Sequence, residues 1–195
     1  MKLSARVQSL TSSPIRKLSP YADAAKAAGK KVYHLNIGQP DIKTPAQFMD
    51  SIRAYQAPVI AYSNSKGEMF LLQAIQEYYA EKGMNFAIDD IFITNGGSEA
   101  LIIAVMALCD PDDEIMVFEP FYANYTTFCK EFGAKINAVP TSVTNGYHLP
   151  TQEEIEKHIT PKTKAILLTN PGNPTGVVLT DDEMKMLVDL AKKHD

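Results

Sequence analysis

The sequence contains no tryptophan, only two cysteines and no long apolar run. Cys109 and Cys129 lie in apolar helical patterns without C-x-x-C spacing, so we expect buried free thiols rather than a disulfide or a metal pair. The longest apolar stretches, 100–109 and 165–169, are far shorter than the roughly 20 residues that span a bilayer. The N-terminus also lacks the apolar core of a signal peptide, and a cytoplasmic location is therefore expected.

An excess of charge of either sign is also missing. The chain has 195 residues, with 19 Lys plus Arg against 23 Asp plus Glu, which gives a formal net charge of -4. Nucleic-acid binders gain affinity mainly by neutralising phosphates, so a chain without a basic stripe is not expected to be one. The four histidines show no metal-ligand spacing, and no metal site is expected.

Apolar residues make up 45% of the chain, which is enough for a sizeable core. From Ile88 onward short apolar runs alternate with helical patterns, and this alternation predicts an α/β fold with a mostly parallel sheet flanked by helices. Strands are expected at 32–36, 91–94, 114–118, 135–139 and 164–169. Residues 1–18 and 37–41 are expected to be irregular. Helices are expected at 20–29, 45–55, 68–82, 98–109, 122–132, 152–158 and from Thr180 to Asp195, with capping boxes at Thr151/Glu154 and Thr180/Glu183.

Three loops follow predicted strands and contain residues suited to a ligand. T-N-G-G-S-E-A-L at 94–101 offers glycines, unpaired helical N–H groups and the Ser98 hydroxyl as an anion cradle, although Ser98 as the N-cap of a tight turn is the simpler alternative. N-P-G-N-P-T-G at 170–176 carries two amide side chains, which can face a ligand oxygen or cap the turn itself. E-P-F-Y-A-N-Y at 119–125 places an aromatic ring where it can cover a planar ligand or join the core.

These loops converge on the carboxyl edge of the predicted sheet, where ligands of open α/β folds bind. Together they indicate a planar, phosphorylated ligand that carries an oxygen. With L-N-I-G-Q-P-D at 35–41 and Y-S-N-S-K-G at 62–67, the five motifs resemble class I aminotransferases, the aspartate-aminotransferase-like members of the fold-type I pyridoxal-phosphate enzymes. The resemblance covers the chain from His34 to its end.

The resemblance implies a pyridoxal 5′-phosphate cofactor, amino-acid and 2-oxo-acid substrates, and a homodimer. It implies that residues 1–45 contribute to a small domain and a dimer contact, and that residues 46–195 form part of the cofactor-binding large domain. It also implies cis peptide bonds before Pro120 and Pro174. The implied contacts are Gly97 and Ser98 to the cofactor phosphate, Tyr122 stacked on its ring, Asn173 donating to its phenolic oxygen, Gly38 near the substrate carboxylate, and Tyr62 reaching the cofactor phosphate of the partner subunit.

No catalytic residue is expected in the chain. The family's Schiff-base lysine belongs to a later S-x-S-K-type segment, and Lys162, Lys164, Lys192 and Lys193 stand in other contexts, on a strand approach or an exposed helix. The alternation of elements stops on a helix where a strand should follow, so we expect an N-terminal fragment of a longer transaminase that has no appreciable turnover alone.

Three other functions remain open at this point. A carbon-sulfur lyase or a cyclopropane-forming synthase of the same fold would share most of these motifs. A non-catalytic ligand-binding or interaction module would keep the fold without the chemistry. A dinucleotide binder is disfavoured, because the chain has no G-x-G-x-x-G.

Overall fold

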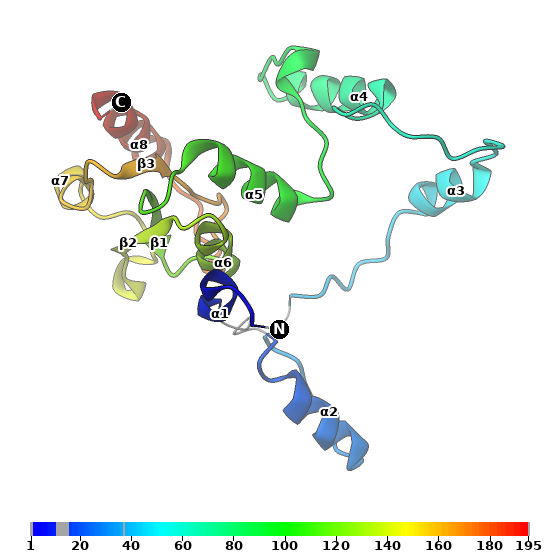
Figure 1. Cartoon of the computed structure of the whole chain (residues 1–195), viewed down its shortest axis with the longest axis horizontal. Coiled ribbons are helices and arrows are strands. Elements are labelled where there is room, and N and C mark those ends of the chain that lie inside the picture. The colour runs from blue at the N-terminus through cyan, green and yellow to red at the C-terminus, as the bar shows by residue number, and fades with distance from the viewer. Residues whose placement is uncertain (1, 11–15, 37, 195) are drawn as a thin grey trace. The chain divides into compact units, whose positions relative to one another are not determined.

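The computed structural model describes residues 2–10, 16–36 and 38–194 (Figure 1). The chain forms two compact units. One contains the residues before Ala25 together with those from Ala100 onward, and the other contains Ala25–Glu99. The predicted helix end at Asp195 and the loop residue Ile37 lie outside the described residues.

The larger unit is built on a parallel sheet of the strand order β2-β1-β3. β1 (Glu114–Glu119) is central, and it pairs with β2 (Lys135–Pro140) in a register that sets Glu114 opposite Lys135 and Glu119 opposite Pro140. β3 (Thr163–Ile166) pairs with β1 on the other side, with a register shift at Glu114/Ile115. The predicted fold class is therefore confirmed.

Alternate residues of β1 point to opposite faces of the sheet, and helices cover both faces (Figure 1). Ile115 and Val117 join a cluster with α5 (Gly97–Leu108) and α6 (Asn124–Glu131). Met116, between them, joins a second cluster with α7 (Gln152–Glu156) and α8 (Asp181–Lys193). Burial on both faces explains why β1 is an apolar run rather than an alternation.

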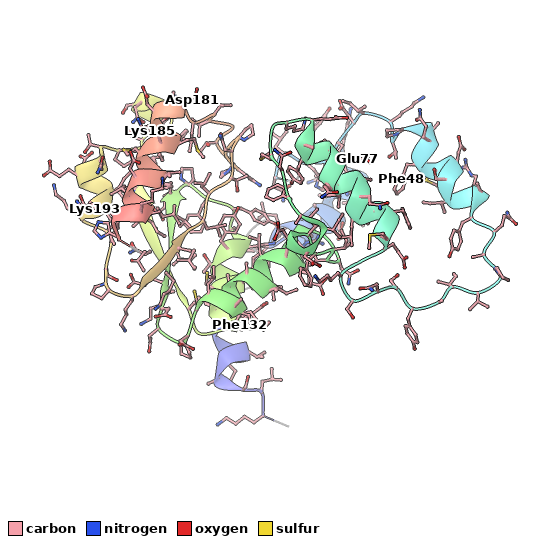
Figure 2. All side chains as sticks on the ribbon, turned by 90° about the horizontal axis from the view of Figure 1, so that it is seen from above. Phe48, Glu77, Phe132, Asp181, Lys185 and Lys193 are labelled. Carbon is pink, nitrogen blue, oxygen red and sulfur yellow. The ribbon has the colours of Figure 1, made fainter. Side chains whose placement is uncertain are left out.

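The helices on the second face begin at the predicted capping boxes. The Thr151 and Thr180 hydroxyls accept hydrogen bonds from the N–H groups of Glu154 and Glu183. In turn, the Glu154 and Glu183 carboxylates accept hydrogen bonds from the N–H groups of Thr151 and Thr180. In α8 acidic residues occupy the first turn, and Lys192 and Lys193 occupy the last. Figure 2 shows Asp181 and Lys193 at opposite ends of this helix. This charge order stabilises the helix dipole.

The remaining helices follow the prediction closely, with one addition. Residues 1–18 were expected to be irregular, yet α1 (Ala5–Ser9) forms behind a Ser4 cap and lies against α6. Its five residues are too few to show a periodic pattern. The other elements are α2 (Ser19–Ala27), α3 (Ala46–Ala54), α4 (Met69–Ala80) and the short 3-10 turns η1 (Ile88–Asp90) and η2 (Val143–Asn145).

Two predicted strands are wrong. In the described part of the chain, residues 32–36 and 91–94 belong to no strand or sheet. A strand requires a ladder of backbone hydrogen bonds to a neighbouring strand. Segment 91–94 makes one backbone hydrogen bond to a distant segment, from the Ile93 N–H to the Lys66 oxygen at 2.9 Å. β3 is also shorter than the predicted 164–169, although the Leu167 N–H still reaches the Met116 oxygen. Among the described helices, none has the length and apolar content needed to cross a membrane.

Candidate functional site

The N-terminus of α5 is an open turn that presents donors. Gly96 has a φ of 81°, in the left-handed region, and the Thr94 hydroxyl donates to its carbonyl at 3.0 Å. A side-chain carbon added at Gly96 or Gly97 would meet nothing within 4 Å. The helix begins at Gly97, so Ser98 is its second residue and not its N-cap, and that simpler alternative is wrong. The first-turn N–H groups of a helix have no partner within it, which suits an anion.

Glu99 takes part in this turn without occupying those donors. Its carboxylate accepts the Asn95 N–H, which precedes the helix, at 2.5 Å. The negative charge in the first turn stabilises the helix dipole. Gly97 and Ser98 are both exposed.

The two asparagines of the 170–176 loop are used differently. The Asn170 side chain accepts the Leu179 N–H at 3.1 Å, so it holds the turn. Asn173 is exposed and lines a cavity. The Gly172 N–H donates to the Val177 oxygen at 2.7 Å, and a side-chain carbon at Gly172 would lie 2.6 Å from the Thr175 hydroxyl. The loop is therefore closed by its own backbone and leaves one amide available.

The expected cis peptide bonds before Pro120 and Pro174 are present. A third, before Pro171, was not expected.

Tyr122 lies half-buried beside two polar neighbours. The Asn124 amide donates to its hydroxyl at 2.7 Å, and the Tyr125 ring meets it edge to face with centroids 5.5 Å apart. The Tyr125 hydroxyl lies 2.5 Å from the Thr169 hydroxyl, at the start of the next loop. Through Tyr125 the structure thus joins the surroundings of Tyr122 to the loop that carries Asn173.

A cavity of about 50 Å³ lies at the carboxyl end of the strands, beside these loops. Its polar lining includes Asn173, Thr169, Tyr125 and Tyr147. The sequence did not single out Thr169 or Tyr147, because the residues that line this cavity come from distant parts of the chain. Tyr122 is outside the lining of this cavity.

The other predicted site residues belong to the second unit. Gly38, Tyr62, Gly97 and Ser98 all lie within Ala25–Glu99. Tyr62 is fully exposed, so it is free to contact another molecule. The roles assigned to these residues stay predictions.

The sequence contains one further lysine in an S-x-S-K context. Ser63-Asn64-Ser65-Lys66 carries the letters S-x-S-K. The Lys66 ammonium lies 2.6 Å from Asp89, and this ion pair lowers the pKa of the Asp89 carboxyl. It also lies 5.4 Å from the centre of the Phe92 ring. The ion pair joins segment 62–67 to η1, so Lys66 acts here as a tether between two parts of the chain.

A side-chain carbon at the next residue, Gly67, would lie 2.3 Å from Ile93, so the chain approaches itself closely here.

Glu183 makes a connection that no local pattern predicts. Besides capping α8, its carboxylate accepts the Leu149 N–H at 2.7 Å and lies 3.0 Å from His148 Nδ1. Burial raises the pKa of Glu183, but hydrogen bonds from the Thr180 and Leu149 N–H groups, with those of His148 and the Thr180 hydroxyl, outweigh it and lower the pKa to about 2. Glu183 therefore fixes the segment that carries Tyr147 to the start of α8.

Both cysteines are buried and free, as predicted. They belong to the cluster between α5, α6 and the sheet. Burial raises the pKa of both thiols, that of Cys129 to about 11.

Comparison with known proteins gives one consistent result. Residues 30–195 match the family described as Aminotransferase class I and II. An aspartate aminotransferase of Thermotoga maritima is 33% identical over 195 residues, covering 99% of this chain and 52% of the relative. One of Bacillus subtilis is 31% identical, covering 100% and 50%. The chain spans about half the length of the curated relatives it matches.

Solved structures agree with this result. The crystal structure of the Thermotoga maritima aspartate aminotransferase superposes with a TM-score of 0.92 at 33% identity, covering 99% of this chain and 52% of the other. An alanine aminotransferase from Pyrococcus furiosus gives a TM-score of 0.90 at 32% identity, covering 99% and 50%.

Proposed function

Because the chain belongs to the class I and II aminotransferases, we propose that it supplies the N-terminal half of a pyridoxal-phosphate-dependent enzyme that moves an amino group between an amino acid and a 2-oxo acid. One observation carries the proposal most directly. The 119–125 and 170–176 loops follow neighbouring parallel strands, and the Tyr125–Thr169 contact links them. These are the loops to which the resemblance assigns the cofactor ring.

The residues present fit the chemistry of the cofactor. A phosphate needs several donors and room for close approach, and the start of α5 offers helical N–H groups, the Ser98 hydroxyl and open space at Gly96 and Gly97. A phenolic oxygen needs a donor, and the Asn173 amide is exposed beside the cavity. A planar ring needs a flat apolar surface, and Tyr122 supplies an aromatic face whose hydroxyl is anchored by Asn124.

When bound, the cofactor supplies an electron-withdrawing ring that stabilises negative charge at the substrate Cα. We assign this chain's residues to holding it. Gly97 and Ser98 donate hydrogen bonds to the phosphate, Tyr122 fixes the plane of the ring, and Asn173 orients its phenolic edge. Gly38 lies near the substrate carboxylate in this assignment.

The proposal extends to domains and partners. Residues 1–45 would contribute to the small domain and the dimer contact, and residues 46–195 to the large domain. The full exposure of Tyr62 supports its reach to the cofactor phosphate of a partner subunit in a homodimer. We propose that the protein is cytoplasmic and acts on small amino and oxo acids.

The 195-residue chain should bind the cofactor weakly and without a covalent bond, because no lysine of the expected later segment is available as base or tether. Equilibrium dialysis of the purified chain against pyridoxal 5′-phosphate tests this. Ser98→Ala should weaken binding roughly tenfold, the effect of one lost hydrogen bond to a charged group. Ser51→Ala is the matched control, because the Ser51 hydroxyl only donates to the Gln47 carbonyl within α3.

Turnover is the decisive second measurement. With L-aspartate, 2-oxoglutarate and cofactor, the chain alone should release no oxaloacetate above the rate of free cofactor. Robust turnover would contradict the assignment of the catalytic lysine to a later segment. Preference for a nicotinamide dinucleotide over pyridoxal 5′-phosphate would contradict the cofactor. In a longer protein that carries the later lysine, release of a 2-oxo acid without ammonia or a thiol would separate a transaminase from a carbon-sulfur lyase.

A further inference from the structure

Tyr125 occupies a central position between the two loops. It lies in the first turn of α6, three residues after Tyr122, and it is 6% exposed. Its ring stacks parallel to Phe121, with centroids 6.3 Å apart, and meets the Tyr122 ring at 85°. Two aromatic neighbours from its own loop therefore fix the orientation of the Tyr125 ring.

The polar end of Tyr125 reaches a different element. Its hydroxyl lies 2.5 Å from the Thr169 hydroxyl, 44 residues away in sequence. Thr169 directly precedes the loop that begins at Asn170 and carries Asn173. The Tyr125 side chain therefore contacts both the Tyr122 ring, which is assigned to the cofactor face, and Thr169, which precedes the loop that carries the Asn173 amide.

We propose that Tyr125 is a positioning residue, which sets the separation between the Tyr122 ring and the loop that carries Asn173. The inference rests on the proposed function for the roles of Tyr122 and Asn173. The ring of Tyr125 fixes the direction in which its side chain points, because the ring packs on Phe121 and Tyr122. Its hydroxyl sets distance, because it is the group that contacts Thr169. Tyr125→Phe separates the two effects, since it keeps the ring and removes only the hydroxyl.

Amide hydrogen exchange tests the mechanical part without any cofactor. The Gly172 and Gly176 N–H groups donate within the loop, to Val177 and Gly172 at 2.7 and 2.8 Å. Tyr125→Phe should speed exchange at these two amides roughly two- to tenfold, the effect of losing one ordinary hydrogen bond that restrains local opening. Amides of β1 report global stability and should not change in the same proportion.

Companion variants identify the contact responsible. Thr169→Val removes the other hydroxyl with little change of shape and should speed exchange to the same extent. The double variant should add nothing further, because both changes break one contact. Tyr55→Phe, at an exposed tyrosine, is the control and should leave the rates unchanged. Unchanged loop rates in Tyr125→Phe, or an equal rise in β1, would overturn the inference.

Binding of a cofactor analogue tests the positioning part. We choose 4′-deoxypyridoxine 5′-phosphate, which has no carbonyl and therefore needs no lysine. Tyr125→Phe should weaken its binding roughly two- to tenfold and leave binding of inorganic phosphate unchanged. Faster loop exchange with unchanged affinity for the analogue would overturn the positioning role. Failure of the unaltered chain to bind the analogue would count against the proposed function, while exchange would still decide whether Tyr125 holds the loop.

Discussion

Replacing Glu183 by glutamine should cost this chain a large part of the stability of its sheet-bearing unit. The Glu183 side chain is 14% exposed and accepts from the Thr180 N–H at 2.7 Å, the Thr180 hydroxyl at 3.0 Å and the Leu149 N–H at 2.7 Å. A glutamine has one acceptor oxygen and places an NH₂ donor against the remaining donors. It therefore cannot replace both oxygens of the carboxylate.

The magnitude follows from the titration of the carboxyl. Its pKa is lowered from an ordinary 4.5 to about 2, and at roughly 1.4 kcal/mol for each pKa unit this corresponds to about 3 kcal/mol. Because the folded-state pKa is the lower one, this stabilisation is fully present above pH 4.5 and is lost as the pH falls through about 2. Glutamine does not titrate, so the two proteins should converge across that window.

Urea unfolding followed by circular dichroism measures the difference. At about pH 7 the unfolding free energy of Glu183→Gln should be lower by about 3 kcal/mol, and the gap should shrink steadily toward about pH 2. Glu153→Gln is the matched control, because Glu153 is 85% exposed and pairs only with Lys157, and it should change stability by less than about 0.5 kcal/mol. A gap that stays constant with pH, or one below about 0.5 kcal/mol at neutral pH, would refute the reasoning.

Two other predictions concern steric fit and thiol access. Gly67→Ala should destabilise the unit that contains it by roughly 2 kcal/mol or more, because the Gly67 backbone has a φ of 117° and the added carbon would lie 2.3 Å from Ile93. Thermal melting measures the loss. Gly38→Ala is the control and should have no comparable effect, because a side-chain carbon at Gly38 meets nothing within 4 Å. Cys109 and Cys129 should react slowly with a disulfide reagent in the native chain and rapidly in urea, because burial raises the pKa of both thiols. Rapid modification of both in the native chain would show that the helical cover of the sheet is not formed.

Local patterns predicted the parts of the fold that local chemistry determines. The capping boxes at Thr151 and Thr180 form as expected, because every group in them lies within four residues. β1 and β2 are found where apolar runs predicted them. Segment 91–94 has the same apolar character but pairs with no strand among the residues that the structure describes, since pairing depends on a partner that composition does not reveal.

The candidate site, like the fold, could be predicted from the sequence only where local chemistry determines it. The sequence located the loops at the ends of the strands, because glycine, proline and asparagine mark turns directly. The loop pattern alone did not distinguish Asn170, which holds the turn, from Asn173, which lines the cavity, and only the family resemblance selected Asn173. The contacts of Tyr125 with Thr169 and of Glu183 with Leu149 join residues 44 and 34 positions apart, and no spacing rule covers such distances.

Gly67 and Gly172 matter when enzymes are identified in genomes by their sequence motifs. Both are letters of the motifs by which the chain is recognised, yet each is required because a side-chain carbon would collide with Ile93 or Thr175 of the same chain. A descendant that had lost every group able to touch a cofactor would still need these glycines in order to close its loops. Selection for folding alone would therefore preserve part of the signature, and inventories built on such letters will include proteins that catalyse nothing.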